Sequence, residues 1–262
     1  MRQLSFVLLI GLGFVVISLG TWPDGISASP DSKMTATPLP PSPAEVCQEA
    51  VDGMNALTAD LLPPEHLLQE KPVKMEGDFD VNAYFTVLDH LAVEDGYILD
   101  YNYYFTPNFG GHPLVYAGPV DADSYPIEPG AYLNRITIDG TPEGYMQFAV
   151  LQIMGQRFYL YWHAAYMDSR IVCDQEALEA AVLSISDAGY RSFSPDELEV
   201  IRGIEVEPTI EFGEDKVTVQ YLSFSRFKGF SRNTVTISRD APPTEFDFES
   251  ELILPYDCGI IY

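Results

Sequence analysis

The sequence lacks every short motif that identifies a common reaction. It contains no G-x-S-x-G nucleophile elbow, no H-E-x-x-H zinc motif, no phosphate-binding loop and no G-x-G-x-x-G dinucleotide fingerprint. The S-x-x-K pattern occurs at 225–228, but this position is a predicted strand end, whereas that nucleophile pattern needs a helix start. We therefore assign no catalytic residue and expect no cofactor.

Basic residues are scarce, with 14 Lys and Arg against 39 Asp and Glu and a net charge of −25. A field of that sign repels polyanions at long range, so nucleic acid is not an expected partner. The scarcity is uneven, because 75–134 contains no Lys or Arg and 216–239 contains no acid. Arg226, Lys228 and Arg232 in the second segment form a candidate binding site for an anionic polymer or glycan. The alternative is that they balance the acidic remainder of their own domain.

Cysteine is also rare, with Cys47, Cys173 and Cys258 widely separated in the sequence. This spacing excludes a cysteine zinc site, and we predict no metal site. In an oxidising compartment three cysteines favour one disulfide and one leftover thiol. We expect the pair Cys47–Cys173, because each residue lies at a predicted helix start; the alternative is three buried free thiols. The chain has no N-x-S/T acceptor for asparagine glycosylation, which favours a bacterial source.

One long apolar run is present, from Leu4 to Gly20, with Arg2 before it and Asp24 after it. This charge order predicts that everything downstream lies outside the cytoplasm. Residues 1–22 are predicted to be a signal peptide or an N-terminal membrane anchor, and only residues 4–22 are expected to contact a membrane. Both alternatives make the chain extracytoplasmic, either secreted or anchored.

Residues 23–42 are rich in Pro, Ser and Thr, a composition typical of a disordered, extended linker. Residues 43–262 follow it, and no second linker of this kind interrupts them. A segment of this length can form one domain with a full core. We therefore predict a single extracytoplasmic domain over 43–262.

Four helices are predicted within this domain. Capping boxes begin two of them, one with Ser42 and Glu45 and one with Ser194 and Glu197. Two others are indicated by apolar spacing of three or four residues after Asp80 and after Asp174.

Strands are predicted over most of the remaining domain. The segment 97–105 alternates in polarity, with a turn at 110–112 after it, and 145–154 and 157–166 form an expected hairpin around Gly155 and Gln156. The later expected strands are 204–212, 216–225, 230–238 and 246–254. Short strands in series without regular helix alternation predict an α+β fold with a largely antiparallel sheet.

Aromatic and acidic strands supply the remaining candidate sites. Trp162 and His163 lie among tyrosines, which is typical of a sugar-binding cleft, although aromatic strands are ordinarily part of a core. Glu245, Asp247 and Glu249 alternate along one strand, which indicates a solvated acidic edge more than a calcium site.

The sequence favours a non-catalytic binding or interaction module at the cell surface, whose partner is an anionic polymer, a glycan or a protein. A glycan-acting hydrolase is the main alternative, because its two carboxylates come from distant positions and leave no motif. A structural component of the cell envelope is the third hypothesis.

Overall fold

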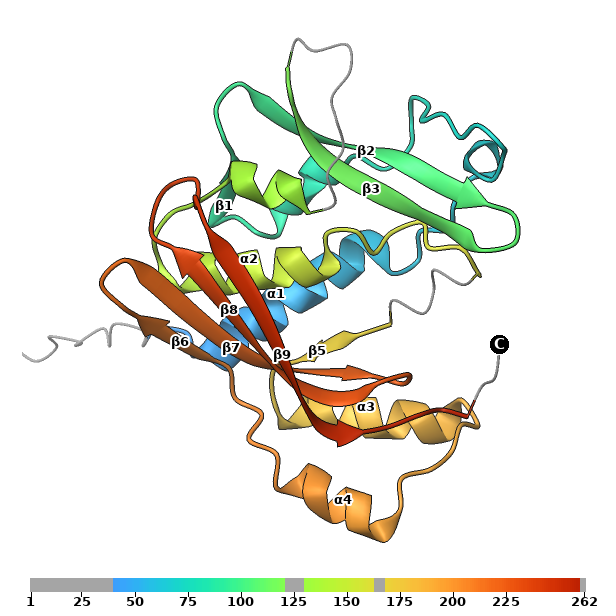
Figure 1. The fold of residues 1–262 in the computed structure, drawn as a ribbon, viewed down its shortest axis with the longest axis vertical. Helices are drawn as coiled ribbons and strands as arrows, with labels where there is room; N and C mark the ends of the chain where they lie inside the picture. The colour runs from blue at the N-terminus through green and yellow to red at the C-terminus, as the bar shows by residue number, and fades with distance from the viewer. Residues whose placement is uncertain (1–39, 121–129, 163–167, 260–262) are drawn as a thin grey trace, which may run out of the picture. The chain divides into compact units, whose positions relative to one another are not determined.

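The computed structural model describes residues 40–120, 130–162 and 168–259. The predicted leader, almost all of the predicted linker, and His163 lie outside these ranges. Residues from Pro40 onward form a compact unit of their own (Figure 1). Within the described ranges, no helix has both the length and the apolar character needed to cross a membrane.

The described residues form four α-helices, α1 (Pro43–Thr58), α2 (Pro142–Met154), α3 (Gln175–Asp187) and α4 (Pro195–Arg202). Both predicted capping boxes are confirmed, because Ser42 and Ser194 each exchange hydrogen bonds with the glutamate three residues later. Short 3-10 helices within the described ranges include Glu65–Leu67, Val81–Thr86 and Ala131–Arg135.

In the part of the chain that the structure describes, nine strands form antiparallel pairs. Strand β1 (Leu91–Val93) pairs with β4 (Ile136–Ile138), and β2 (Tyr97–Thr106) pairs with β3 (Gly110–Pro119). A five-stranded sheet contains β5 (Arg170–Val172), β6 (Thr209–Phe212), β7 (Lys216–Ser225), β8 (Gly229–Ser238) and β9 (Phe246–Pro255). The predicted α+β fold with a largely antiparallel sheet is confirmed.

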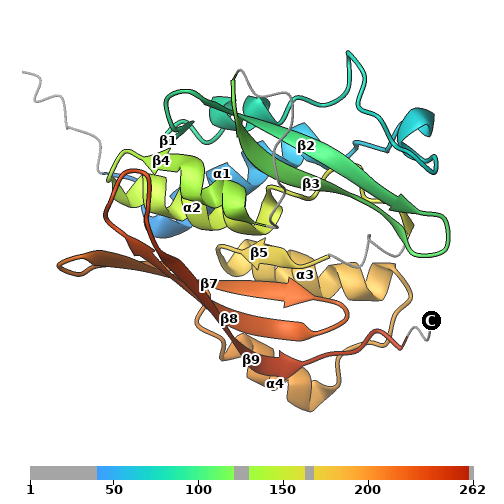
Figure 2. The ribbon, with the colours of Figure 1, turned by 45° about the horizontal axis from the view of Figure 1, so that its top comes forward.

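The five-stranded sheet lies between two hydrophobic cores. Helices α1 and α2 lie between the β2–β3 hairpin and this sheet, as the two views agree in showing (Figures 1 and 2). Val217 and Val219 of β7 belong to the core shared with α1 and α2, whereas Leu222 and Phe224 belong to the core of α3 and α4. Because successive strand residues point to opposite faces, one strand supplies both cores.

The predicted hairpin over 145–166 is wrong, because 145–154 lies within α2. All residues from Gly144 to Leu151 are buried, so the helix is apolar on every side and shows no 3.6-residue periodicity. Thr141 begins this helix by accepting a hydrogen bond from the Gly144 N–H at 3.1 Å, and Pro142 occupies its first turn. Gly155 ends the helix and forms no hairpin turn.

Two smaller predictions also need correction. The helix expected after Asp80 is a 3-10 helix that ends at Thr86, and Gly110 to His112 belong to strand β3, with the turn before them. The later strands agree closely with prediction, except that β6 begins at Thr209. Strand β9 is an edge of the sheet, as its alternating acids indicate. The described residues hold no group of three or more His, Cys, Asp or Glu side chains that could bind a metal ion.

The predicted disulfide Cys47–Cys173 is confirmed, and it joins α1 to the residue after β5. Both cysteines are fully buried, and Cys258 is a buried free thiol in the core of α3 and α4. A disulfide is consistent with an oxidising, extracytoplasmic environment.

Candidate functional site

A cleft of about 520 Å³ lies between α1, α3, β5 and the chain that follows α2. Gln48, Val51, Asn55 and Thr58 line it from one face of α1, at the spacing that aligns side chains along a helix. Ala177, Ala180 and Ala181 line it from α3. We infer that these short side chains leave the hollow open. Its volume falls in the range of small-molecule sites.

Arg157 is the most unusual residue of this cleft. It follows α2 by three residues, and its guanidinium donates a hydrogen bond to the Ser169 carbonyl oxygen. Burial lowers the pKa of Arg157 to about 10, and the nearby Asp168 carboxylate partly opposes this effect. Among the described residues, no carboxylate lies within ion-pair distance of Arg157. It is therefore a desolvated cation whose charge is incompletely balanced.

Asp168 is the carboxylate that acts on the pKa of Arg157, but it already bonds to other residues. Its oxygens accept hydrogen bonds from the Ser225 hydroxyl at 2.7 Å and from Arg226 Nε and backbone N at 2.8 and 3.1 Å. Its side chain is only 11% exposed. These three bonds orient the Asp168 carboxylate toward Ser225 and Arg226. They do not involve Arg157.

The local charge at the cleft is opposite to that of the whole chain. Arg157, Arg170 and Asp168 are the charged side chains in its described lining, and Arg226 contacts Asp168 from the turn after β7. The described lining thus holds two cations and one anion in a protein of net charge −25, and Arg226 already pairs with that anion. A ligand approaching this cleft meets positive charge that low-dielectric walls strengthen.

A buried hydroxyl near Arg157 is also unsatisfied. Tyr221 Oη on β7 has no hydrogen-bond partner among the described residues, and it lies close enough to influence the charge of Arg157. Leaving a buried polar group unpaired costs about 1–3 kcal/mol. The region behind the cleft therefore has unused hydrogen-bonding capacity as well as unbalanced charge.

The three predicted basic residues direct their side chains to three different partners. Arg226 contacts Asp168 and donates to the Tyr190 hydroxyl at 2.9 Å, whereas Lys228 donates to Ser250 Oγ of β9 at 3.2 Å. Arg232 donates to the Glu205 carbonyl oxygen at 2.5 Å. Only Arg226 therefore borders the cleft. Docking of an anion at all three residues stays a prediction.

Trp162 was predicted to bind sugar. It lies five residues after Arg157 and is 51% exposed. Trp162 and Tyr159 have φ values of +49° and +53°, in the left-handed region that non-glycine residues rarely adopt. Backbone strain of this kind often accompanies functional segments. His163, which was predicted to act with Trp162, is outside the described residues.

One further cluster resembles a catalytic arrangement but differs from it in geometry. Asp139 Oδ2 lies 2.7 Å from His90 Nδ1, and Thr141 Oγ1 lies 3.2 Å from the same nitrogen. In a proton relay the hydroxyl and the carboxylate contact opposite ring nitrogens. Thr141 instead caps α2, so this cluster stabilises a helix start and is no nucleophilic triad.

Sequence reasoning missed Arg157 and the cleft. The lining combines α1 with three segments between Met154 and Ala181, and Arg157 belongs to no motif. No protein-family model, no curated protein sequence and no solved structure matches the chain.

Proposed function

We propose that the chain is a non-catalytic binding module outside the cytoplasm, whose cleft binds an anionic ligand that bears a carboxylate or phosphate group. Residues 1–22 would export or anchor it, and residues 23–42 would space it from a membrane. The observation that carries the proposal is the desolvated Arg157 guanidinium in a cleft of ligand size. Arginine binds carboxylate and phosphate through paired hydrogen bonds.

The composition of the cleft supports binding more than hydrolysis. A glycoside hydrolase needs two carboxylates facing one sugar bond. The described lining contributes one carboxylate, Asp168, and three hydrogen bonds already engage it.

Thermal unfolding of the unit from Pro40 to Tyr262 tests the proposal, with succinate and phosphate as ligands and sodium chloride at matched ionic strength as the reference. We expect at least one ligand to raise the unfolding temperature. A ligand at 100 times its dissociation constant adds about 2.7 kcal/mol to stability, which a thermal scan resolves.

The variant Arg157→Gln should abolish this shift, because it removes the cation and keeps a polar side chain. Arg202→Gln is the matched control, since Arg202 is exposed on α4 and outside the cleft lining. Equal shifts in the parent protein and Arg157→Gln would contradict the proposal, as would no shift with either ligand.

A further inference from the structure

The β2–β3 hairpin has a second face whose side chains remain open to solvent. Its inner face is buried, with Leu99, Tyr101 and Val115 in the core. On the outer face the register pairs Asp100 with Tyr116, Asn102 with Leu114 and Tyr104 with His112. All six of these residues, which we call the ribbon face, are exposed or half-buried.

One end of the ribbon face carries an aromatic pair. The rings of Tyr104 and His112 lie 5.5 Å apart, and Tyr104 is 52% exposed. Burial lowers the pKa of the His112 imidazole, so at neutral pH this ring is uncharged and offers one donor and one acceptor. A flat apolar surface and a neutral hydrogen-bonding group thus occur at the same place.

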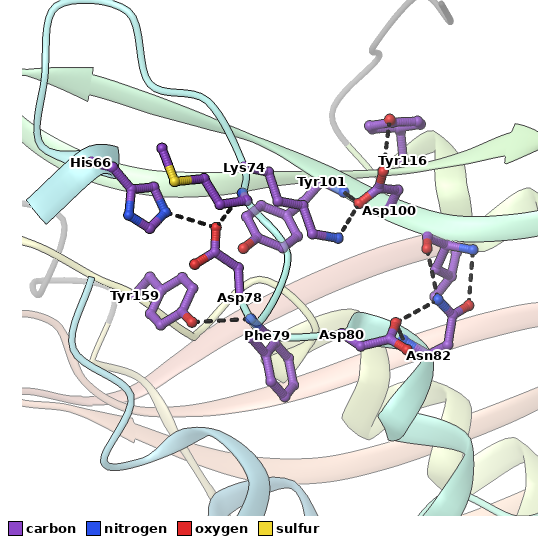
Figure 3. A network of polar contacts seen from close by, with 12 residues as sticks. His66, Lys74, Asp78, Phe79, Asp80, Asn82, Asp100, Tyr101, Tyr116 and Tyr159 are labelled. Carbon is purple, nitrogen blue, oxygen red and sulfur yellow. Dashed lines mark hydrogen bonds and ion pairs between the residues drawn. The ribbon is translucent and has the colours of Figure 1, made fainter. Parts of the chain in front are cut away.

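The other end carries a fixed aromatic ring. Tyr116 Oη donates to Asp100 Oδ2 at 3.3 Å, and Lys74 Nζ lies 2.5 Å from Asp100 Oδ1 (Figure 3). Below the same strand, Asn82 bonds to both the N–H and the carbonyl oxygen of Leu99. These contacts fix the hairpin in place before any ligand arrives, which reduces the entropy lost on binding.

Polar groups on the ribbon face are available for a ligand. Within the described part of the chain, no hydrogen bond engages the Asn102 amide, the Tyr104 hydroxyl or the His112 ring nitrogens. The two ends are four residues apart along the strands, about 13 Å at the usual strand rise. The face therefore combines stacking surfaces at its ends with an amide between them, over a length greater than one sugar ring.

Charge distinguishes among the possible occupants of this face. The segment 75–134 contains no Lys or Arg, and Lys74 already neutralises Asp100. Among the six described residues of the ribbon face, an acidic glycan or an anionic membrane surface would meet no cationic side chain, and the acids of this segment would repel it. Pyranose rings fit better, because their C–H faces stack on aromatic rings and their hydroxyls bond to amide, phenol and imidazole groups.

We propose that the ribbon face binds a neutral oligosaccharide, with the Tyr104–His112 pair as the main stacking site. This site is independent of the anion-binding cleft, since no residue lines both.

Isothermal titration calorimetry on the full chain, held in a polyoxyethylene detergent that carries no sugar, tests this proposal. The probes are cellohexaose, chitohexaose, xylohexaose and mannohexaose at up to about 5 mM, which detects dissociation constants in the millimolar range. Hexagalacturonate serves as the acidic counterpart. We expect at least one neutral hexasaccharide to bind more tightly than hexagalacturonate.

Tyr104→Ala should weaken that binding about tenfold, equivalent to about 1.4 kcal/mol, with no change in unfolding temperature because the ring is half exposed. Phe248→Ala, which removes a ring 40% exposed on β9, should leave binding unchanged. Arg157→Gln should also leave it unchanged, which separates this site from the cleft.

No binding by any neutral hexasaccharide overturns the proposal. Binding that survives Tyr104→Ala places the sugar elsewhere and overturns it as well. Adsorption to phosphatidylcholine vesicles that Tyr104→Ala abolishes, without any sugar binding, would assign the face to a membrane.

Discussion

At the scale of single residues, burial and hydrogen-bonding partners together determine the charge state of several side chains. Arg157 is desolvated, whereas Asp168 is engaged by Ser225 and Arg226. The hydrogen bond that the His90 ring donates to Asp139 raises the pKa of His90, although partial burial acts against it. Burial acts to raise the pKa of Asp139, but hydrogen bonds from Thr141 and His90 hold it below its usual value.

The His90–Asp139 pair predicts a pH dependence whose sign is fixed by these shifts. A raised folded-state pKa of His90 gives stability that is full below about pH 6.5 and is lost as pH rises through that folded pKa. The depressed pKa of Asp139 gives stability that is lost at acid pH. The pair therefore stabilises the fold most between about pH 4 and pH 6.5.

Asp139→Asn should lower the pKa of His90 toward about 6.5, as measured by NMR titration of its ring protons. The same variant should lose more unfolding temperature at about pH 5.5 than at about pH 8.5. Asp89→Asn is the control, because Asp89 is 3.9 Å from the ring and largely exposed. An unchanged His90 pKa in Asp139→Asn would refute this account.

At the scale of secondary-structure elements, helix starts depend on side chains that lie just outside the helix. Glu197 of α4 bonds back to the Ser194 N–H at 2.7 Å and to both Nη atoms of Arg191 at 2.9 and 3.0 Å. These bonds, with Arg191 contributing most, lower the pKa of Glu197 to about 2.

Glu197→Gln should therefore destabilise the protein at pH 7, by no more than about 1 kcal/mol because solvent screens this exposed pair. The loss should shrink as pH falls from about 4.5 toward 2, where the parent glutamate itself takes up a proton. Urea unfolding at several pH values measures it. A difference that stayed constant down to pH 2 would exclude the ionic contribution.

Loss of the disulfide should lower the free energy of unfolding more than Glu197→Gln does, because the bond joins cysteines 126 residues apart in sequence. Replacing both Cys47 and Cys173 by alanine should cost about 2–5 kcal/mol in urea unfolding. Cys258→Ala, which removes a buried thiol without breaking a crosslink, is the control and should cost less. Equal costs would indicate that cavity formation, and not the crosslink, accounts for the loss.

Elements with a visible boundary or period were predictable from the sequence, and elements without one were not. The capping boxes located α1 and α4, and alternating polarity located β2 because one of its faces is buried. Helix α2 is buried all round, so neither period is visible and its apolar residues suggested a strand. The cleft was not predictable, because Arg157 and Asp168 come together only when α1, α3 and β5 are in place.

At the scale of the whole molecule, the net charge of −25 makes the protein repel itself in the folded state. Added salt should therefore stabilise it, since the Debye length falls from about 30 Å at 0.01 M to about 3 Å at 1 M. We expect the unfolding temperature to rise by about 2–4 °C for each kcal/mol gained as sodium chloride increases. Potassium chloride should act equally, and a fall in unfolding temperature would contradict this prediction.

The positions of the three cysteines also determine the order in which they become available during synthesis. A ribosome releases the chain from its N-terminus, so Cys47 and Cys173 emerge before Cys258, which lies close to the C-terminus. The two cysteines of the native disulfide are thus the first two to leave the ribosome. The last one is buried in the core of α3 and α4, where folding withdraws it from thiol exchange. The order of translation thus favours the native pair Cys47–Cys173 over either pairing with Cys258.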